Sequence, residues 1–143
     1  MIKITDDMRT LVNKALADDV ACLVGTVDPD GYPSLGPKGS VLVFDDQTLA
    51  YWERSHRSSI VNVRNNAKTV VYYRNPNARD KLPGGAVRFY GRAEVHPTGP
   101  IREKVKSMVV QAELDKDPEN KGIAVLIHVD RIGDLGGKTL QSR

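Results

Sequence analysis

The stretch Arg54-Ser-His-Arg-Ser-Ser-Ile-Val-Asn-Val-Arg-Asn-Asn-Ala-Lys68 lies between two strand-like runs, Thr48–Glu53 and Thr69–Tyr73. Within it, Ile60 and Val63 fall on one side of a short helical pattern whose other side is polar. A short basic helix therefore connects two strands. We expect the elements on both sides to converge on the start of this helix.

The start of this helix is a candidate anion site. The first amides of a helix lack partners within the helix, and the helix dipole favours negative charge at the same place. Arg57 adds a fork of donors, and Ser58 and Ser59 add compact hydroxyls that can approach an anion closely. The alternative is that Ser58 only caps the helix and Arg57 is a solvated surface residue.

Two hairpins precede this segment. The apolar run Val20–Val27 is followed by the turn Asp28-Pro-Asp-Gly31, in which Pro presets one φ and Gly supplies a positive one, so a hairpin to Tyr32–Gly36 is predicted. Ser40–Phe44, a polar turn and Leu49–Trp52 repeat the pattern. These short turns predict antiparallel pairing of the strands.

Helices and strands alternate irregularly along the rest of the chain. Thr5 is a suitable cap for an amphipathic helix that extends to Leu16. A second amphipathic helix is predicted from Pro100 to about Leu114, with Arg102 and Glu113 on its polar face. The remaining predictions are a strand over Ala86–Val95 with a bulge at Gly91, a last strand over Gly122–Val129 and a tail over Gly136–Arg143.

The predicted elements indicate one domain over residues 1–143. Six or seven mostly antiparallel strands with helices at the start, in the middle and late in the chain predict a mainly β fold with some α. A closed or partly closed barrel with the helices packed outside fits this pattern better than a doubly wound sheet.

Composition narrows the functional class. A net charge of +3 without any block of like charges argues against nucleic acid as a partner. The single Cys22 lies in an apolar run, so we expect an inert core thiol and a reducing, cytoplasmic environment. No signal sequence or apolar stretch long enough to span a membrane is visible, and we expect no membrane association.

Other motifs give weaker predictions. In Pro37-Lys-Gly-Ser40, Gly39 permits close approach of a ligand and Lys38 offers positive charge, although a plain turn with a surface lysine explains the residues equally. The three histidines, at positions 56, 96 and 128, show no metal-ligand spacing, and we expect no metal site. No G-x-S-x-G motif is present, and the sequence identifies no catalytic side chain.

The order of the motifs resembles the pyridoxamine 5'-phosphate oxidase-related, FMN-binding split-barrel family. The resemblance covers nearly the whole chain, and its specificity lies in the order and spacing of loose motifs. They are Asp28-Pro-Asp-Gly-Tyr-Pro33, Gly36-Pro-Lys-Gly-Ser40, Phe44-Asp-Asp-Gln-Thr-Leu-Ala-Tyr51, Arg57-Ser-Ser-Ile-Val-Asn-Val-Arg-Asn-Asn66, Val70-Val-Tyr-Tyr73 and Arg88-Phe-Tyr-Gly-Arg-Ala-Glu94.

The resemblance implies a split β-barrel homodimer with FMN at the subunit interface. By that resemblance, a strand over Pro37, Lys38, Gly39, Ser40 and Val41 lines the flavin, and Trp52 and Glu53 lie beside the ribityl chain. The phosphate would be held at Ser58 and Ser59, where many members carry Arg-Lys or Lys-Thr, with Arg57 immediately before them. Arg88 is a further candidate for the flavin wall.

The resemblance leaves the reaction open. True pyridoxamine phosphate oxidases continue past the last strand into a segment with Trp and Arg residues, so we expect a reaction other than vitamin B6 oxidation. The first hypothesis is an FMN-dependent oxidoreductase acting on a small-molecule substrate or electron donor. The alternatives are a non-catalytic flavin, haem or deazaflavin carrier on the same fold, and a nucleic-acid adaptor suggested only by the basic pI.

Overall fold

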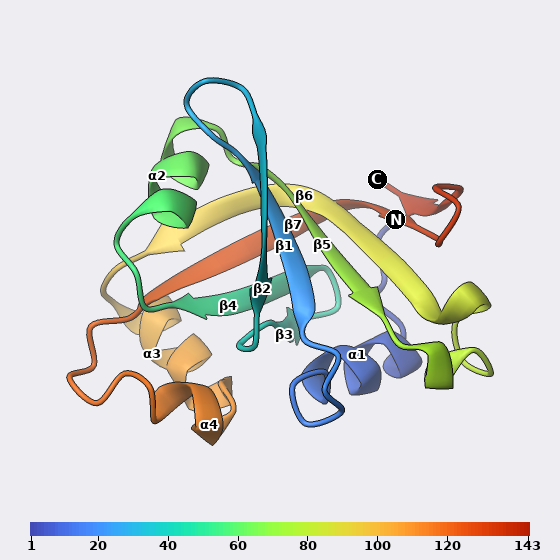
Figure 1. The fold of residues 1–143 in the computed structure, drawn as a ribbon, viewed down its shortest axis with the longest axis horizontal. Coiled ribbons are helices and arrows are strands. Elements are labelled where there is room, and N and C mark those ends of the chain that lie inside the picture. Colours follow the sequence, from blue (N-terminus) through green and yellow to red (C-terminus); the bar gives the residue numbers. More distant parts are fainter.

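A single antiparallel sheet of eight strands dominates the computed structural model, which describes residues 1–143 (Figure 1). The strands run in the order β2-β1-β5-β6-β7-β4-β3, and β8 pairs with β7. Their bounds are β1 Cys22–Val27, β2 Pro33–Lys38, β3 Leu42–Asp45, β4 Thr48–Glu53, β5 Lys68–Arg74, β6 Ala86–His96, β7 Ile123–Gly133 and β8 Thr139–Ser142.

Four α-helices lie outside the sheet, as predicted for a mainly β fold with some α. They are α1 Asp6–Asn13, α2 Ser58–Asn65, α3 Pro100–Met108 and α4 Gln111–Leu114, and the 3-10 turns η1 Pro76–Ala78 and η2 Pro83–Gly85 join β5 to β6. In Figure 1, α2 lies on one side of the molecule and the β7–β8 hairpin on the other. None of the helices is both long enough and apolar enough to cross a membrane.

Both predicted hairpins are confirmed. β1 pairs with β2 through the turn at Asp28, whose Oδ1 accepts hydrogen bonds from the amides of Asp30 and Tyr32 at 2.9 Å each. Gly31 has a φ of 87°, the conformation for which its glycine was predicted. β3 pairs with β4 across a register shift between Val43 and Asp45.

The sheet remains open between β2 and β3, which do not pair, so the barrel is partly closed. The range Pro37–Val41, expected to lie on one strand, instead contains the end of β2 and the turn that precedes β3. The Ser40 hydroxyl explains the turn. It accepts a hydrogen bond from Trp52 N at 2.9 Å and donates one to Trp52 O at 3.0 Å. At this position of β4, the Ser40 side chain therefore takes the place of the backbone of a neighbouring strand.

The core has two parts. The larger cluster of 22 buried residues includes Tyr51, Tyr73 and Phe89, and the smaller cluster of seven includes Trp52 beneath α3. Cys22 belongs to the larger cluster, and burial raises the pKa of its thiol to about 12. The prediction of an inert core thiol is therefore confirmed.

The helix boundaries depart from the sequence pattern. Thr5 caps α1 as predicted, but α1 ends at Asn13 rather than at Leu16. The predicted helix from Pro100 to Leu114 is two helices, because Val109 and Val110 have extended backbone conformations.

Three polar side chains expected at the surface are buried. Arg102 stacks on Trp52 with 4.7 Å from its guanidinium carbon to the ring centroid, and Glu113 packs against Gly39. Asn62 of α2 donates to Thr26 Oγ1 at 2.9 Å. Arg102 donates to the carbonyl oxygens of Gly122 and Asn120, and Glu113 accepts from Lys116 three residues later, so each of the three buried polar groups has a hydrogen-bond partner.

The last predictions concern β6 and the C-terminal segment. The bulge at Gly91 is confirmed by a register shift between Tyr90 and Gly91 against β7. The segment expected to be a tail contains β8, which pairs with β7 from Arg131 to Gly133. The Met1 amino group donates to Ser142 O at 3.1 Å, so the two chain ends lie together.

Candidate functional site

The start of α2 has the features predicted for an anion site. Arg57 occupies the N-cap position with an extended backbone, and its side chain makes no capping hydrogen bond. Arg57 is exposed and takes part in none of the ten ion pairs of the protein. The first amides of α2 and the Arg57 guanidinium are therefore available to an anion.

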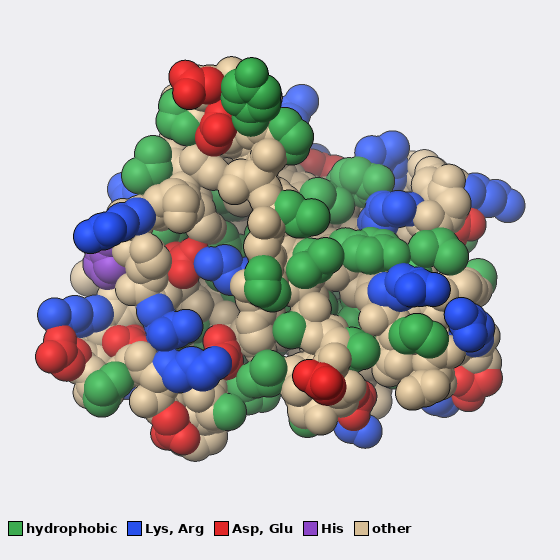
Figure 2. Space-filling model, in the orientation of Figure 1, with side chains coloured by type: hydrophobic (Ala, Val, Ile, Leu, Met, Phe, Trp, Pro, Cys, Tyr) green, Lys and Arg blue, Asp and Glu red, His purple; other side chains and the backbone are tan.

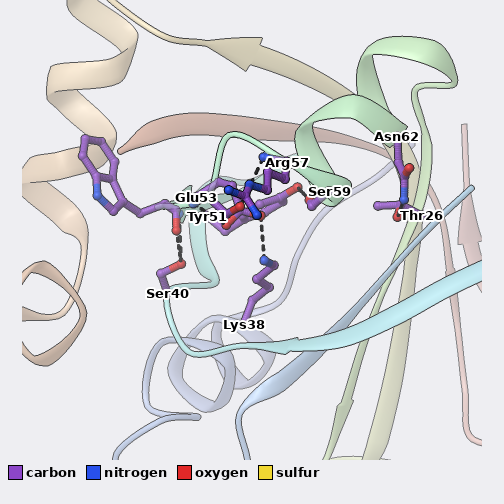
Figure 3. A network of polar contacts seen from close by, with 10 residues as sticks. Thr26, Lys38, Ser40, Tyr51, Glu53, Arg57, Ser59 and Asn62 are labelled. Carbon is purple, nitrogen blue, oxygen red and sulfur yellow. Dashed lines mark hydrogen bonds and ion pairs between the residues drawn. The ribbon is translucent and has the colours of Figure 1, made fainter. Parts of the chain in front are cut away.

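Tyr51 holds one of the two serine hydroxyls in place. Its ring is fully buried on β4, and its Oη lies 3.0 Å from Ser59 Oγ (Figure 3). Burial raises the pKa of Tyr51 to about 12, outweighing the bond from Ser59, while the nearby Glu53 raises it further. Tyr51 thus stays protonated at neutral pH and fixes the position of Ser59.

An ion pair crosses the open side of the barrel next to this helix. Lys38 Nζ, at the end of β2, lies 2.6 Å from Glu53 Oε1, at the end of β4 (Figure 3). The Glu53 side chain is only 6% exposed, and its other oxygen accepts from Ser55 N at 3.3 Å. Because Glu53 neutralises Lys38, Arg57 is left as the unpaired cation at the start of α2.

Two grooves flank Lys38. The first has a volume of about 180 Å³ and lies between β1, β2 and the start of α2, and the second has about 270 Å³ and lies between the β2–β3 turn, the end of β4 and α4. Figure 2 shows basic side chains on this face near α2 and over α4. The first groove is lined by Val24, Thr26, Ser34, Leu35, Gly36, Lys38, Ser58 and Ser59.

Most of the predicted site residues come together in these grooves. Ser58 and Ser59 line the first, Lys38 lines both, and Pro37, Gly39, Ser40, Trp52 and Glu53 line the second. Arg57 is the N-cap residue of α2, directly before Ser58, and lines neither groove. Val41 is buried in the core.

Arg88 does not join this group. Its Nη1 donates to the carbonyl oxygens of Asp134 and Leu135, both at 2.6 Å, and its guanidinium lies over the ring of Tyr72. These contacts hold it at the β7–β8 connection, across the molecule from α2 (Figure 1). Within one chain, Arg88 supports the C-terminal hairpin.

A set of contacts that the sequence did not indicate fixes the end of β4. Trp52 Nε1 donates to Asp117 Oδ2 at 2.9 Å, and the same carboxylate accepts from the amides of Lys121 and Gly122. Burial alone would raise the pKa of Asp117, but these hydrogen bonds lower it below its usual value. His56 Nε2 lies 2.9 Å from Lys121 O, which ties the segment before α2 to the same loop.

The sequence also missed three charged residues that line the second groove: Arg54, Glu113 and Lys116. Glu113 and Lys116 lie near α4, more than 50 positions after β4, so no local pattern could place them beside Glu53. In the described chain, no three His, Cys, Asp or Glu side chains are arranged to hold a metal ion.

Comparison with known proteins identifies the family. The model of the pyridoxamine 5'-phosphate oxidase family matches residues 5–131, whereas no curated protein sequence matches the chain. HupZ from Group A Streptococcus has a similar structure, with 28% identity, a TM-score of 0.73, and coverage of 96% of this chain and 99% of that one.

Two further structures share the fold. A putative pyridoxamine 5'-phosphate oxidase from Lactobacillus delbrueckii is 26% identical, with a TM-score of 0.64 over 92% of this chain and 98% of that one. A heme binding protein from Mycobacterium smegmatis is 16% identical, with a TM-score of 0.64 over 88% of this chain and 52% of that one, a likeness of fold alone. The match over residues 5–131 and the shared split-barrel architecture show that the chain belongs to the pyridoxamine 5'-phosphate oxidase family.

Proposed function

We propose that the protein is a cytoplasmic, FMN-binding oxidoreductase that acts on a small molecule other than the vitamin B6 substrate. The start of α2 carries this proposal. Free helix amides, the unpaired Arg57 and the hydroxyls of Ser58 and Ser59 form a donor set that fits a phosphate. Family membership supports a flavin as the molecule that carries the phosphate.

The residues at the start of α2 fit the phosphate of FMN and offer it one positively charged side chain. Lys38 is already neutralised by Glu53, so Arg57 supplies the free positive charge at the phosphate end. Ser59, held by Tyr51, supplies a fixed hydroxyl. A charge-assisted hydrogen bond contributes about 1.5–3 kcal/mol, so the loss of the single cation should be readily measured.

The second groove would hold the ring end of the cofactor. Pro37, Gly39 and Ser40 present backbone from the β2–β3 turn, and Trp52 and Glu53 close the other side. When bound, FMN supplies an acceptor for a hydride or for electrons, so the chain need only bind and orient the reactants. The Lys38–Glu53 pair would keep this wall close to neutral.

We further propose that the protein acts as a homodimer with the two cofactor sites at the subunit interface. Both grooves are open and, at about 180 and 270 Å³, fall below the usual size of a ligand pocket, about 300–1,000 Å³. Tyr32 and Leu35 beside the first groove are 70% and 66% exposed. A second copy seated on β2 would cover these side chains and complete the pocket.

A non-catalytic carrier of flavin, haem or deazaflavin is the second candidate. The ionisable side chains at the site favour a carrier, because Glu53 is paired with Lys38 and Tyr51 is held protonated, so neither is free to act as a catalytic acid or base. Reduction of the bound flavin by NADH or NADPH, followed by reoxidation with an acceptor, would exclude a pure carrier. A chain that binds haem or deazaflavin more tightly than FMN would favour the carrier.

Substitution of Arg57 tests the phosphate assignment. Arg57→Ala should weaken FMN binding about tenfold or more, because it removes the free charge, while riboflavin binding should not change. Affinities are measured by quenching of flavin fluorescence. Arg64→Ala, an exposed arginine in the last turn of the same helix, is the control. Equal weakening of FMN and riboflavin by Arg57→Ala would rule out a phosphate role.

A further inference from the structure

One face of β5, β6 and β7 collects basic side chains that are scattered in the sequence. Residues paired across a sheet lie on the same face, as do residues two apart on one strand. β5 pairs with β6 without a register shift, with Lys68 opposite Arg92 and Tyr72 opposite Arg88. Arg74 follows Tyr72 by two residues on β5. The pairing therefore places four cations on one face of these two strands.

β7 extends the same face with a fifth cation. Arg131 lies opposite Tyr90 of β6, and its guanidinium carbon is 4.0 Å from the centroid of the Tyr90 ring. The guanidinium carbon of Arg88 is 5.2 Å from the centroid of the Tyr72 ring. Two arginine–tyrosine stacks thus lie next to each other. We call the surface the β5–β7 face; it consists of Lys68, Arg74, Arg88, Arg92 and Arg131 with Tyr72 and Tyr90.

Three of these cations are free. Lys68, Arg74 and Arg131 are exposed, and none of them takes part in an ion pair. Their positive charge is therefore available to a partner, and their substitution should not disturb the fold.

The carboxylates nearby do not neutralise the face. Asp130 pairs with Arg92 at 3.1 Å and with Arg143 at 2.6 Å, so two arginines share one carboxylate. Glu94 lies two residues beyond Arg92 on β6 and is paired with His96. An excess of positive charge remains along the face, and it complements a polyanion.

The β5–β7 face is separate from the sites described above. None of its residues lines either groove. The strand β1 lies between β5 and β2, on which the second copy of the chain is proposed to sit. α3 covers only the start of β7, at Ala124 and Leu126, and α2 buries Ile60 in the barrel core.

We propose that the β5–β7 face binds single-stranded nucleic acid. Lys68 and Arg74 would contact phosphates, while bases would stack on the guanidinium planes that Tyr72 and Tyr90 support. From Lys68 to Arg74, β5 spans about 20 Å, which suits a short site of about four nucleotides. The sequence shows no block of like charges because strand pairing, rather than chain order, brings these cations together.

Binding to oligonucleotides tests the proposal. The purified chain, without added flavin, is titrated into fluorescein-labelled oligo(U) RNA and oligo(dT) DNA of about 12 nucleotides, and fluorescence anisotropy is recorded. At least one of them should bind saturably. The logarithm of the affinity should fall against the logarithm of the salt concentration with a slope of about −3, as expected for about four neutralised phosphates.

Two other polyanions distinguish the arginine–tyrosine stacks from charge alone. A DNA duplex of the same length and vesicles containing phosphatidylserine offer negative charge but no unstacked bases. Both should bind more weakly than the single strand. The proposal is overturned if neither oligonucleotide binds saturably, or if the duplex or the vesicles bind as tightly as the single strand.

Matched variants locate the site. Lys68→Gln, Arg74→Gln and Arg131→Gln should each weaken binding about threefold to tenfold at low salt, and each should make the salt slope shallower by about 0.7. Lys14→Gln removes an exposed cation at the end of α1, away from the sheet face, and should bind like the unsubstituted chain. A chain with all three substitutions that kept its affinity and its salt slope would contradict the proposal.

The proposal does not depend on the flavin. Oligonucleotide binding is measured without FMN, at residues that take no part in the donor set at the start of α2. A chain that binds oligonucleotides and not FMN would support the β5–β7 face and contradict the flavoprotein. The reverse result would support the flavoprotein and contradict the β5–β7 face.

Discussion

Tyr51 connects the barrel core to the start of α2. It is fully buried, and its hydroxyl makes its one side-chain hydrogen bond to Ser59 at 3.0 Å. A buried aromatic ring cannot move without disturbing the packing around it, so it holds Ser59 in a fixed position before any anion arrives. Tyr51 is therefore a positioning residue for the proposed phosphate site.

Tyr51→Phe should weaken FMN binding about threefold to tenfold, since it removes one neutral hydrogen bond that orients Ser59. Riboflavin, which lacks the phosphate, should bind the variant and the unsubstituted chain alike. Tyr72→Phe, on β5 against Arg88 and away from α2, is the matched control. A parallel loss of affinity for both flavins would indicate a general packing defect instead.

The sequence predicted individual site residues where the signal is local. Arg57, Ser58 and Ser59 follow from the pattern of one helix start, and the structure brings them together there. The sequence did not reveal that Lys38 is neutralised by Glu53, because this pair joins strands that are not neighbours in the sheet. The sequence also did not reveal that Glu113 is buried against Gly39, because the two residues lie far apart in the chain.

At the scale of elements, the bulge in β6 depends on Gly91. A Cβ at this position would lie 2.4 Å from the carbonyl oxygen of His128 on β7, and backbone cannot retreat as a flexible side chain can. The close approach of the two strands therefore requires glycine.

Gly91→Ala should lower the free energy of unfolding by about 3 kcal/mol or more, because the methyl group forces β6 and β7 apart. Urea denaturation measures the change. Gly36→Ala in β2, where an added Cβ meets nothing within 4 Å, should have little effect. Similar unfolding midpoints for the two variants would contradict the close contact.

The loop after α4 is tied to β4 through Asp117, whose pKa is lowered by hydrogen bonds that outweigh the effect of burial. A lowered folded-state pKa adds stability above the unfolded value of about 3.9, and that stability is lost as the pH falls through the folded value. Asp117→Asn should therefore cost about 1–3 kcal/mol at pH 7.

The stability difference between Asp117→Asn and the unsubstituted chain should begin to shrink as the pH falls below about 4, where the carboxylate of the unfolded chain takes up a proton, and should be lost as the pH falls through the lower pKa of the folded chain. Denaturation at several pH values measures this. Asp115→Asn, an exposed neighbour that contacts only Gln111, is the control and should show no such trend. A constant difference across the pH range would show that the charge of Asp117 is unimportant.

Elements with strong local signals were predicted, and those that depend on tertiary pairing were not. The turn at Asp28 and Gly31 encodes its hairpin in four residues. β8 has no alternating apolar pattern and forms because β7 offers it an edge. The helical periodicity continues through Val109 and Val110 without Gly or Pro, so the break between α3 and α4 had no signal.

At the scale of the whole molecule, the two sides of the open barrel differ in chemistry. The gap between β2 and β3 exposes the two grooves, the Lys38–Glu53 pair and the start of α2, whereas the β7–β8 side is closed by Arg88. The exposed apolar side chains of β2 border the open side. A cofactor and a second copy of the chain would both find their contacts on this one face.

The most direct measurement is a titration of the purified chain with FMN, followed by flavin fluorescence and by the visible absorption spectrum. The phosphate site at α2 predicts saturable binding of one FMN per chain, with riboflavin binding at least about tenfold more weakly because it cannot use Arg57 and Ser59. No saturable binding of FMN, or equal affinity for FMN and riboflavin, would contradict it.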